Sequence, residues 1–179
     1  MSVISKKNDE CLMIMIQKHH HQAFDILVQR HHQRFYAISY RMLFNQNDTQ
    51  DIVQEAFLKL WNNPNSYQSE KSLFTTWFYR VIANLCLDYK KKIKTQLIEH
   101  IDHVADPSDL EENLEQEQAQ FNLKQAIISL PKRQRLAIVL CFYENMSNKQ
   151  AAQIMNIRLK ALQSLLMRGK AQLKQKLNL

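Results

Sequence analysis

The chain contains a single glycine, Gly169, in 179 residues, where about twelve are usual for this length. Glycine adopts positive φ without steric cost, and hairpin turns and phosphate-binding loops depend on it. The sequence therefore disfavours a many-stranded sheet, a dinucleotide-binding fold and a β-sandwich. Because 45% of the residues are apolar, enough to fill one or two small cores, the sequence predicts an all-α protein.

The composition is basic, with 24 Lys and Arg against 17 Asp and Glu and a net charge of +7. This balance favours a polyanionic partner such as nucleic acid, although charge alone does not separate DNA, RNA and an anionic membrane. The three cysteines are far apart in the sequence and suit a reducing cytoplasm. The N-terminus lacks the pattern of a secretion signal, and no apolar run approaches about 18 residues. We therefore expect a soluble cytoplasmic protein with no direct membrane insertion.

The charges divide the chain into three parts. Residues 1–98 are moderately basic, residues 99–123 hold eight acids and no Lys or Arg, and residues 124–179 hold eleven basic residues and one acid. The acidic stretch contains the turn-forming sequence D-P-S-D at 106–109, which predicts a solvated linker with a short helix beginning near Ser108. An acidic helix packed within one domain is the alternative. The domains we expect are two helical ones, residues 1–97 and 119–179, joined by an acidic linker over residues 98–118.

Helical periodicity is clear in the N-terminal part. Apolar residues recur at helical spacing over residues 9–18 and 22–44. A third helix is predicted to have Asp48 as its N-cap and to bury a stripe that includes Ile52 and Ala56. Its remaining surface is acidic and polar, which suits a protein contact better than DNA, although the helix dipole also favours acids in a first turn. The residues of this surface are Asp48, Asp51, Gln54 and Glu55.

A polar loop over residues 62–72 precedes another helix, predicted from Leu73 to Lys92. The buried stripe of this helix is predicted to contain Phe74, Phe78, Val81, Ile82, Leu85 and Tyr89. Tyr79 and Arg80 fall outside this stripe, with Trp77 at its boundary. Interleaved cations and aromatic rings suit single-stranded nucleic acid, because cations follow phosphates and rings stack on bases for about 1–3 kcal/mol each. A core position for Trp77 is the alternative.

The C-terminal part has the pattern of a helix-turn-helix. Pro131 suits the first turn of a helix that extends to about Tyr143. The sequence S-N-K-Q from Ser147 has the form of a capping box, which begins a helix. A break at residues 156–158 separates this helix from a second one. The buried positions predicted on the second helix are Leu162, Leu165, Leu166, Gly169 and Leu173.

The face of the second helix opposite its leucines is predicted to be exposed. This face presents Lys160, Gln163, Ser164 and Met167, with Arg168 on the flank. In a helix-turn-helix the second helix enters the major groove with its N-terminal residues at base edges, so Lys160 and Gln163 are candidates for reading bases. Candidates for holding phosphates are Arg168, Lys170 and Lys174. An ordinary amphipathic helix is the alternative, which the basic charge of this part disfavours.

Several segments, in this order, resemble the extracytoplasmic-function (ECF) sigma factors, the smallest bacterial sigma factors. The sequence DTQDIVQEAFL at 48–58 is similar to the polymerase-binding motif of the family, and FTTWFYRVIAN at 74–84 resembles its promoter-melting helix. Residues 130–135 together with 147–170 are similar to its helix-turn-helix. The resemblance implies a sigma region 2 helical bundle followed by a sigma region 4 helix-turn-helix.

The same resemblance implies a function and its residues. The chain would bind core RNA polymerase through the β′ clamp and the β flap, melt the minus-10 element of promoter DNA, recognise the minus-35 element and be held inactive by an anti-sigma factor. The polymerase-binding residues would be Asp48, Asp51, Gln54 and Glu55. The minus-10 contacts would come from Asn62, Tyr67, Thr76, Trp77, Arg80, Asn84 and Lys91. The minus-35 contacts would come from Arg158, Lys160, Gln163, Ser164, Met167 and Arg168.

Three departures from the family pattern concern turns and promoter sequence. His19 and Asn156 stand at turns where the family often has glycine, and asparagine can adopt the left-handed conformation. The reading helix begins with R-L-K at 158–160, where the family often has a small residue and a β-branched one.

Other classes of function remain as alternatives. The sequence has no nucleophile–base pair at informative spacing, so we expect no enzyme, no catalytic residue and no cofactor. The histidine runs 19–21 and 31–32 suggest a metal site, but neighbouring residues diverge by about 100° on a helix and do not converge on one ion. A stand-alone helix-turn-helix regulator that does not bind polymerase would explain the C-terminal part, but not the acidic face at 48–55 or the helix of Trp77.

Overall fold

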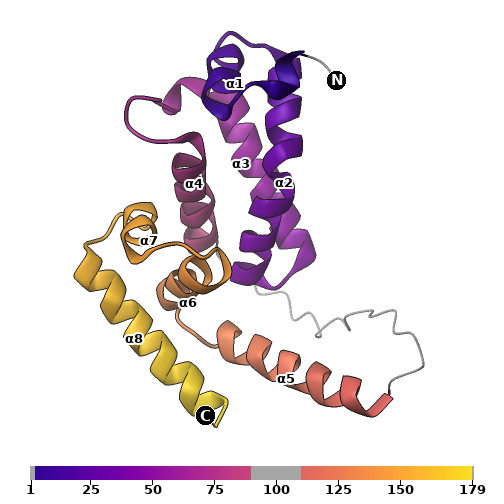
Figure 1. Cartoon of the computed structure of the whole chain (residues 1–179), viewed down its shortest axis with the longest axis vertical. Coiled ribbons are helices and arrows are strands. Elements are labelled where there is room, and N and C mark those ends of the chain that lie inside the picture. Colours follow the sequence, from indigo (N-terminus) through magenta and orange to yellow (C-terminus); the bar gives the residue numbers. More distant parts are fainter. Residues whose placement is uncertain (1–2, 90–109, 179) are drawn as a thin grey trace.

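The computed structural model describes residues 3–89 and 110–178 of the chain. Every regular element in these ranges is helical, which confirms the all-α prediction, and the elements form two lobes (Figure 1). The N-terminal lobe comprises η1 (Val3–Lys6), α1 (Asp9–Ile16), α2 (His21–Leu43), α3 (Gln46–Asn62), η2 (Pro64–Ser66) and α4 (Phe74–Asp88). The C-terminal lobe comprises α5 (Leu110–Ile128), α6 (Lys132–Ile138), η3 (Val139–Tyr143), α7 (Asn148–Ile154) and α8 (Leu159–Lys176). Within the described ranges, no helix combines the length and the apolar character that crossing a membrane requires.

Aromatic rings fill the core of the N-terminal lobe, where α2 packs against α1, α3 and α4. Phe35, Phe74 and Phe78 are fully buried. The ring centroids of Phe35 and Phe78 are 4.7 Å apart, and those of Phe74 and Phe78 are 5.3 Å apart. Burial of such side chains stabilises the fold by roughly 1.5–3 kcal/mol each. This core fixes the positions of α3 and α4, which carry the candidate site residues of the lobe.

Two helix boundaries in the N-terminal lobe differ from the sequence prediction. The N-cap of α3 is Asn45, whose side chain accepts a hydrogen bond from the Asp48 amide at 2.9 Å. The prediction that Asp48 caps this helix is therefore wrong, and Asp48 lies in the first turn. Helix α4 ends at Asp88 rather than at Lys92, with Tyr89 as its C-cap, and residues 90–92 lie outside the described residues.

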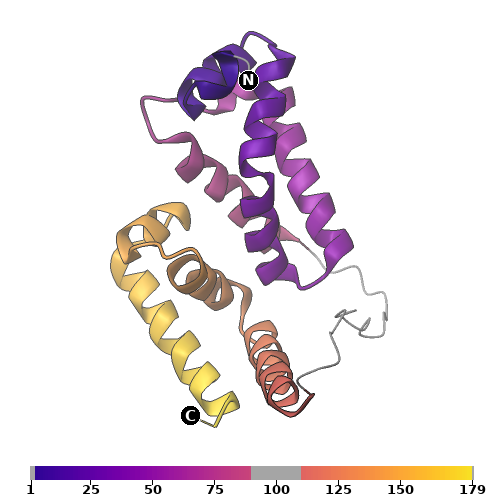
Figure 2. The same cartoon turned by 45° about the vertical axis from the view of Figure 1, so that its right-hand side comes forward.

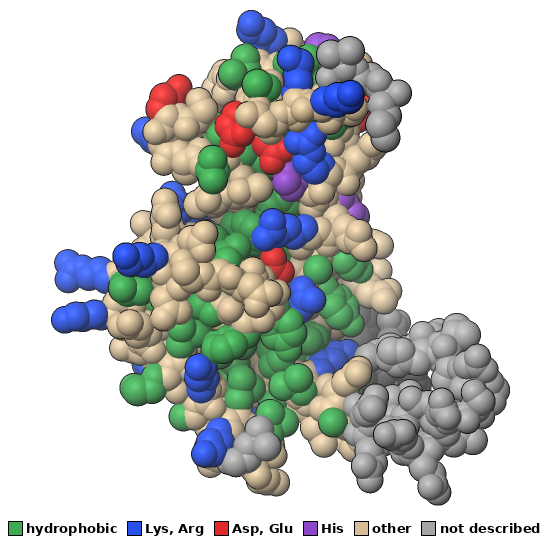
Figure 3. All heavy atoms as spheres, in the orientation of Figure 1, with side chains coloured by type: hydrophobic (Ala, Val, Ile, Leu, Met, Phe, Trp, Pro, Cys, Tyr) green, Lys and Arg blue, Asp and Glu red, His purple; other side chains and the backbone are tan. Residues whose placement is uncertain are grey.

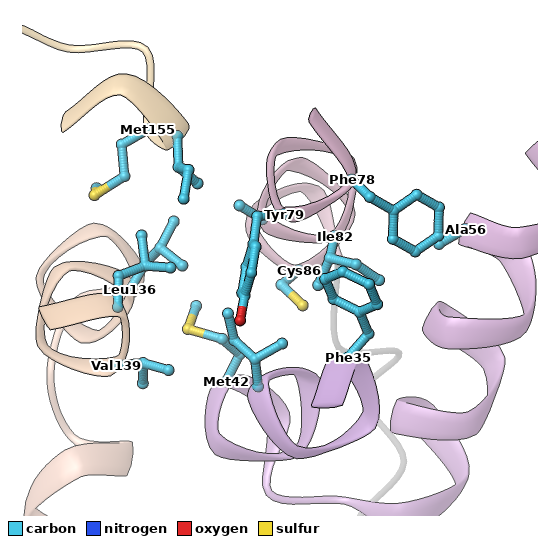
Figure 4. Packing of buried hydrophobic residues seen from close by; sticks show 14 of the residues in the cluster. Phe35, Met42, Ala56, Phe78, Tyr79, Ile82, Cys86, Leu136, Val139 and Met155 are labelled. Carbon is cyan, nitrogen blue, oxygen red and sulfur yellow. The ribbon is translucent and has the colours of Figure 1, made fainter. Parts of the chain in front are cut away.

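The prediction that Tyr79 lies off the buried stripe of α4 is also wrong. Its side chain is only 2% exposed, because the C-terminal lobe covers a second face of the helix. Figure 4 shows the Tyr79 ring between Leu136 of α6 and Met42 of α2, while Phe78 points into the N-terminal core. Helix α4 is thus buried on two sides, by its own lobe and by the other lobe.

The helices before the helix-turn-helix are longer and less regular than predicted. In place of a short helix from about Ser108, α5 is a helix of 19 residues from Leu110, and its first residues fall within the predicted linker. The predicted helix from Pro131 to Tyr143 is α-helical only to Ile138 and continues as the π-helical segment η3. The amide of Glu144 there donates to the Val139 carbonyl, five residues earlier, at 3.1 Å.

The helix-turn-helix follows the predicted pattern closely. The capping box is confirmed, since the Gln150 amide donates to Ser147 Oγ at 3.3 Å and the Ser147 amide donates to Gln150 Oε1 at 3.0 Å. Asn156 is left-handed at the turn, with a φ of 51°. Gly169 is buried, and a Cβ atom there would lie 3.3 Å from Ile138 Cγ1. The absence of a side chain at Gly169 therefore lets α8 pack closely on α6.

The two lobes are not independent bodies, because their buried residues form one continuous hydrophobic cluster. Leu136, Val139 and Met155 of the C-terminal lobe face Met42 and Tyr79 of the N-terminal lobe (Figure 4). Helix α7 packs on α4, and the turned view of Figure 2 shows the same arrangement. The two predicted helical domains are present, but they share a contact that the sequence did not indicate.

Candidate nucleic-acid interface

The outer face of α3 forms an exposed acidic stripe. Asp51, Gln54 and Glu55 are exposed, and Asp48 is half-buried. Leu58, one turn further along the same stripe, is 50% exposed. Glu55 Oε1 lies 2.7 Å from Lys59 Nζ, an exposed pair that contributes little to stability. The stripe thus places exposed carboxylates beside an exposed leucine. The sequence prediction omitted Leu58, although its spacing of seven residues from Asp51 places it on this face.

The acidic stripe extends toward the end of α4. Burial and the neighbouring carboxylates of Asp48 and Asp51 raise the pKa of Tyr89 to about 12. The phenol therefore keeps its proton at neutral pH and remains a hydrogen-bond donor next to the carboxylates. Both carboxylates therefore lie near the C-cap of α4, and Asp51 is the more exposed of the two.

The loop between α3 and α4 is held by polar contacts from α1. The side-chain amide of Gln17 donates to the carbonyls of Pro64 at 3.4 Å and Tyr67 at 3.3 Å. Tyr67, which the sequence placed at the DNA surface, is 2% exposed, and its hydroxyl donates to the Ser72 carbonyl at 3.1 Å. Tyr67 therefore supports the loop from inside, while Asn62 lies at its exposed start.

Helix α4 presents a mixed aromatic and polar surface beside this loop. Trp77 is half-buried, with its ring centroid 5.5 Å from that of Tyr67, and Thr76 is half-buried next to it. Asn84 is exposed two turns along the helix. Arg80 is half-buried, because its Nη2 donates to the Gln153 carbonyl of α7 at 3.0 Å. The prediction for Lys91 falls outside the described residues.

The outer face of α8 is exposed as the sequence pattern indicates. Leu162 and Leu166 are buried on the inner face. The exposed side chains of the outer face are Arg158, Lys160, Gln163, Ser164, Met167 and Arg168. Arg168 Nε donates to the Ser164 carbonyl at 3.2 Å, which directs the guanidinium along the helix. The structure therefore exposes all six predicted minus-35 residues, five of them on the outer face of α8 and Arg158 at its N-cap.

An apolar groove that the sequence did not reveal lies between α5, η3 and α8. It has a volume of about 240 Å³, and Phe142 at its edge is 50% exposed. Lys170 Nζ lies 4.6 Å from the centroid of the Phe142 ring. The lining residues are Leu123, Ile127, Ile138, Phe142, Tyr143, Lys170 and Leu173. Figure 3 shows hydrophobic side chains gathered over the C-terminal lobe on one face of the molecule. Only the fold assembles this groove, because its residues come from four separate elements, α5, α6, η3 and α8.

The histidine runs do not converge on one point. His19 and His21 pack against the ring of Trp61, at centroid distances of 6.4 and 4.7 Å. His31 Nε2 lies 2.7 Å from Asp9 Oδ2, and Asp9 Oδ1 accepts from Arg30 at 2.5 Å. The Asp9 contacts hold α1 against α2, and the rings of His19 and His21 pack on α3, so these three histidines have structural roles.

These features define a two-lobed, all-helical protein with an acidic helix face, an aromatic helix beside a polar loop, and a helix-turn-helix. Two family models match the chain, Sigma-70 region 2 over residues 27–95 and Sigma-70, region 4 over residues 120–173. The ECF RNA polymerase sigma factor SigW of Bacillus subtilis is 30% identical over 159 residues, which cover 80% of this chain and 83% of SigW. The ECF RNA polymerase sigma factor SigE of Mycolicibacterium smegmatis is 31% identical over 146 residues, or 79% of this chain and 56% of that protein.

Solved structures share the fold. CnrH, in a complex with the cytosolic domain of CnrY, has a TM-score of 0.70 at 21% identity, over 95% of this chain and 97% of CnrH. The sigma factor RpoE from Bartonella quintana, in a complex with the anti-sigma factor NepR, has a TM-score of 0.63 at 17% identity, over 87% and 97% of the two chains.

The chain belongs to the ECF RNA polymerase sigma factors, as its match to SigW and the two region models establish. Its function is therefore promoter-specific initiation of transcription together with RNA polymerase, and the family consists of initiation factors rather than enzymes. The stand-alone regulator is not favoured, because such a protein would have no use for a region 2 lobe.

Proposed function

We propose that each of three surfaces of this sigma factor has one task. The acidic stripe of α3, formed by Asp48, Asp51, Gln54 and Glu55, binds the β′ clamp of core polymerase, with Leu58 as its apolar contact. The loop over residues 62–72 and the outer face of α4 hold the melted minus-10 strand. The outer face of α8 reads the minus-35 element as duplex. The observation that carries this proposal is that Asp51, Gln54 and Glu55 of the acidic stripe and the outer face of α8 are exposed, one surface on each lobe.

The minus-10 surface is proposed with one change from the sequence prediction. Trp77, Arg80, Asn84, Thr76 and Asn62 contact the strand, and Lys91 follows phosphates beyond the end of α4. Tyr67 supports the loop from inside and does not stack on a base, because its hydroxyl is bonded within the loop and its ring packs on Trp77.

The proposed domains are region 2 over residues 1–97, an acidic linker over 98–118 and region 4 over 119–179. The apolar groove of region 4 is the proposed contact for the β flap, since its exposed phenylalanine suits an apolar partner. An anti-sigma factor is a further proposed partner, because CnrH and RpoE were solved in complexes with CnrY and NepR. Because core polymerase and promoter DNA are in the cytoplasm, we also propose that this sigma factor acts there.

The polymerase contact is tested by Asp51→Arg, which reverses one charge at the centre of the stripe. We expect affinity for core polymerase to fall by more than about tenfold, the loss typical of a like-charge contact at an interface. Binding to a duplex promoter fragment is expected to stay unchanged. Asp25→Arg, which makes the same change at an exposed position of α2, is the control. Equal core affinity of the two variants would contradict the assignment of the stripe.

The minus-35 contact is tested by Lys160→Ala in run-off transcription with core polymerase. We expect promoter preference to change at the position that Lys160 reads, by about tenfold or more. Lys176→Ala is the control, because Lys176 lies about 24 Å further along the same helix by the rise per residue. A Lys160 variant with the promoter preference of the wild type would remove this residue from the reading surface.

A further inference from the structure

The one acidic residue between positions 124 and 179, Glu144, lies in the contact between the lobes. It directly follows η3, and its side chain is 8% exposed. Its Oε2 accepts hydrogen bonds from the Tyr79 hydroxyl and from Arg34 Nε, the latter at 3.3 Å. Its Oε1 lies 3.7 Å from Arg41 Nη1. Three groups of the N-terminal lobe therefore surround one carboxylate of the C-terminal lobe.

These three groups form a site for an anion. Arg34 and Arg41 are seven residues apart on α2 and share one face of it. Aromatic rings orient both guanidinium groups, since Arg34 Cζ lies 5.1 Å from the centroid of Tyr79 and Arg41 Cζ lies 4.9 Å from that of Tyr143. Burial and the hydrogen bond to Glu144 raise the pKa of Tyr79, so its hydroxyl stays a donor. Guanidinium groups bind carboxylates and phosphates with the same geometry.

The contact between the lobes also uses a residue of the proposed minus-10 surface. Arg80 follows Tyr79 on α4, and its Nη2 donates to the Gln153 carbonyl of α7 at 3.0 Å. Within the described part of the chain, Arg80 Nε is buried without a hydrogen-bond partner. Tyr79 and Arg80 are neighbours on α4, so the contact with Glu144 and the contact with α7 engage adjacent residues of the helix that carries the proposed minus-10 surface.

We propose that Arg34, Arg41 and Tyr79 form an anion site that binds the Glu144 carboxylate when the lobes are closed and a phosphate of promoter DNA when they separate. Glu144 and DNA then compete for one site. This inference rests on the proposed function, because it takes the minus-10 strand to lie along α4. A buried carboxylate is stable only while it is paired, so Glu144 leaves the site only by separation of the lobes into water.

The competition is tested with Glu144→Gln, which keeps the shape and removes the charge. In small-angle X-ray scattering, the variant chain is expected to have a larger radius of gyration than the wild type. It is also expected to bind a short fluorescent single-stranded DNA about tenfold more tightly, since a charge-assisted contact no longer opposes the DNA. Asp25→Asn removes one negative charge at an exposed position of α2 and is the matched control. We expect Asp25→Asn to change this affinity by less than about twofold.

The phosphate part of the proposal is tested by Arg34→Gln in the Glu144→Gln background. The double variant is expected to lose the gain in DNA affinity, and the slope of log affinity against log salt is expected to fall by about 0.7, the value for one phosphate of single-stranded DNA. An unchanged slope would overturn the phosphate site. Glu144→Gln with the size and DNA affinity of Asp25→Asn would overturn the competition.

Two further measurements separate this inference from folding defects and from the proposed function. Circular dichroism reports whether each variant is folded, and Tyr79→Phe provides a milder change that removes one donor to Glu144 and keeps the ring. We expect Tyr79→Phe to expand the chain in the same direction by a smaller amount. Run-off transcription by the wild-type chain tests the proposed function by itself. A chain that initiates transcription, but that neither Glu144→Gln nor Tyr79→Phe expands, contradicts the anion site alone.

Discussion

The core of the N-terminal lobe is held by aromatic rings, whereas the contact between the lobes combines apolar packing with charged side chains. Phe35, Phe74 and Phe78 are fully buried, and the ring of Phe78 contacts the other two. Between the lobes, Glu144 is paired with arginines, and Lys132 Nζ donates to the Leu87 carbonyl at 2.9 Å. Water replaces charged partners far more readily than it replaces ring contacts. The difference indicates a rigid lobe joined to its neighbour by a reversible contact.

Among the substitutions that test this comparison, one in the aromatic core is expected to destabilise the protein most. Phe78→Ala removes a ring that contacts both Phe35 and Phe57. We expect the free energy of unfolding to fall by about 3–5 kcal/mol, the usual loss for a buried phenylalanine. Urea denaturation followed by circular dichroism measures this change. Leu58→Ala, at an exposed position, serves as the reference, and a loss no larger than in that variant would contradict the role of the ring.

Arg135 tests the polar side of the comparison. Its Nε donates to the Ile127 carbonyl at 3.1 Å, and its Nη1 donates to the Met42 carbonyl of the other lobe at 2.5 Å. Burial lowers the pKa of Arg135. Arg135→Ala removes these hydrogen bonds, including the one to Met42 of the other lobe, and we expect the free energy of unfolding to fall by about 1–3 kcal/mol. Thermal unfolding of Arg133→Ala, which removes an exposed arginine from the same helix, provides the comparison. If the two variants have the same melting temperature, the guanidinium of Arg135 does not stabilise the contact between the lobes.

Lys132 has the smallest expected effect, and its salt dependence separates electrostatic from packing contributions to the contact between the lobes. Its ammonium group donates to the Leu87 and Tyr89 carbonyls at the C-terminal end of α4. A cation at this end interacts with the helix dipole, so Lys132→Ala is expected to weaken the closed arrangement by about 0.5 kcal/mol. Scattering at low salt measures the shift in radius of gyration, with Lys149→Ala as the exposed control. Because salt screens exposed charges, the difference should disappear in 1 M salt, where the Debye length is about 3 Å. A difference that persists there would assign the effect to packing instead.

Local signals allowed the fold and most of the candidate site to be predicted. The capping box at Ser147, the left-handed Asn156 and the exposed face of α8 depend on residues close in sequence, and each is present. The family motifs at 48–58 and 74–84 lie on α3 and α4, as the resemblance implied.

The errors of the sequence prediction come from contacts between distant segments. Tyr79 is buried because Glu144, 65 residues away, accepts its hydrogen bond. Tyr67 is buried because Gln17 of α1 holds the loop around it. The error at Asp48 is local instead, since Asn45, three residues earlier, is the N-cap and its side chain accepts from the Asp48 amide. The spacing of apolar residues predicts one buried face for each helix. Helix α4 has two, because the C-terminal lobe covers the second one.

The π-helical segment η3 determines the direction in which the Glu144 side chain points from the helix axis. In η3 the amide of Glu144 bonds to a carbonyl five residues back rather than four, so this turn contains one residue more than an α-helical turn. If residues 139–143 became α-helical with no residue removed, position 144 would be rotated by about 100° around the axis. The carboxylate would then point away from Tyr79, although every side chain of the site would still be present. A shift of helical register would thus uncouple the lobes without changing any residue of the anion site.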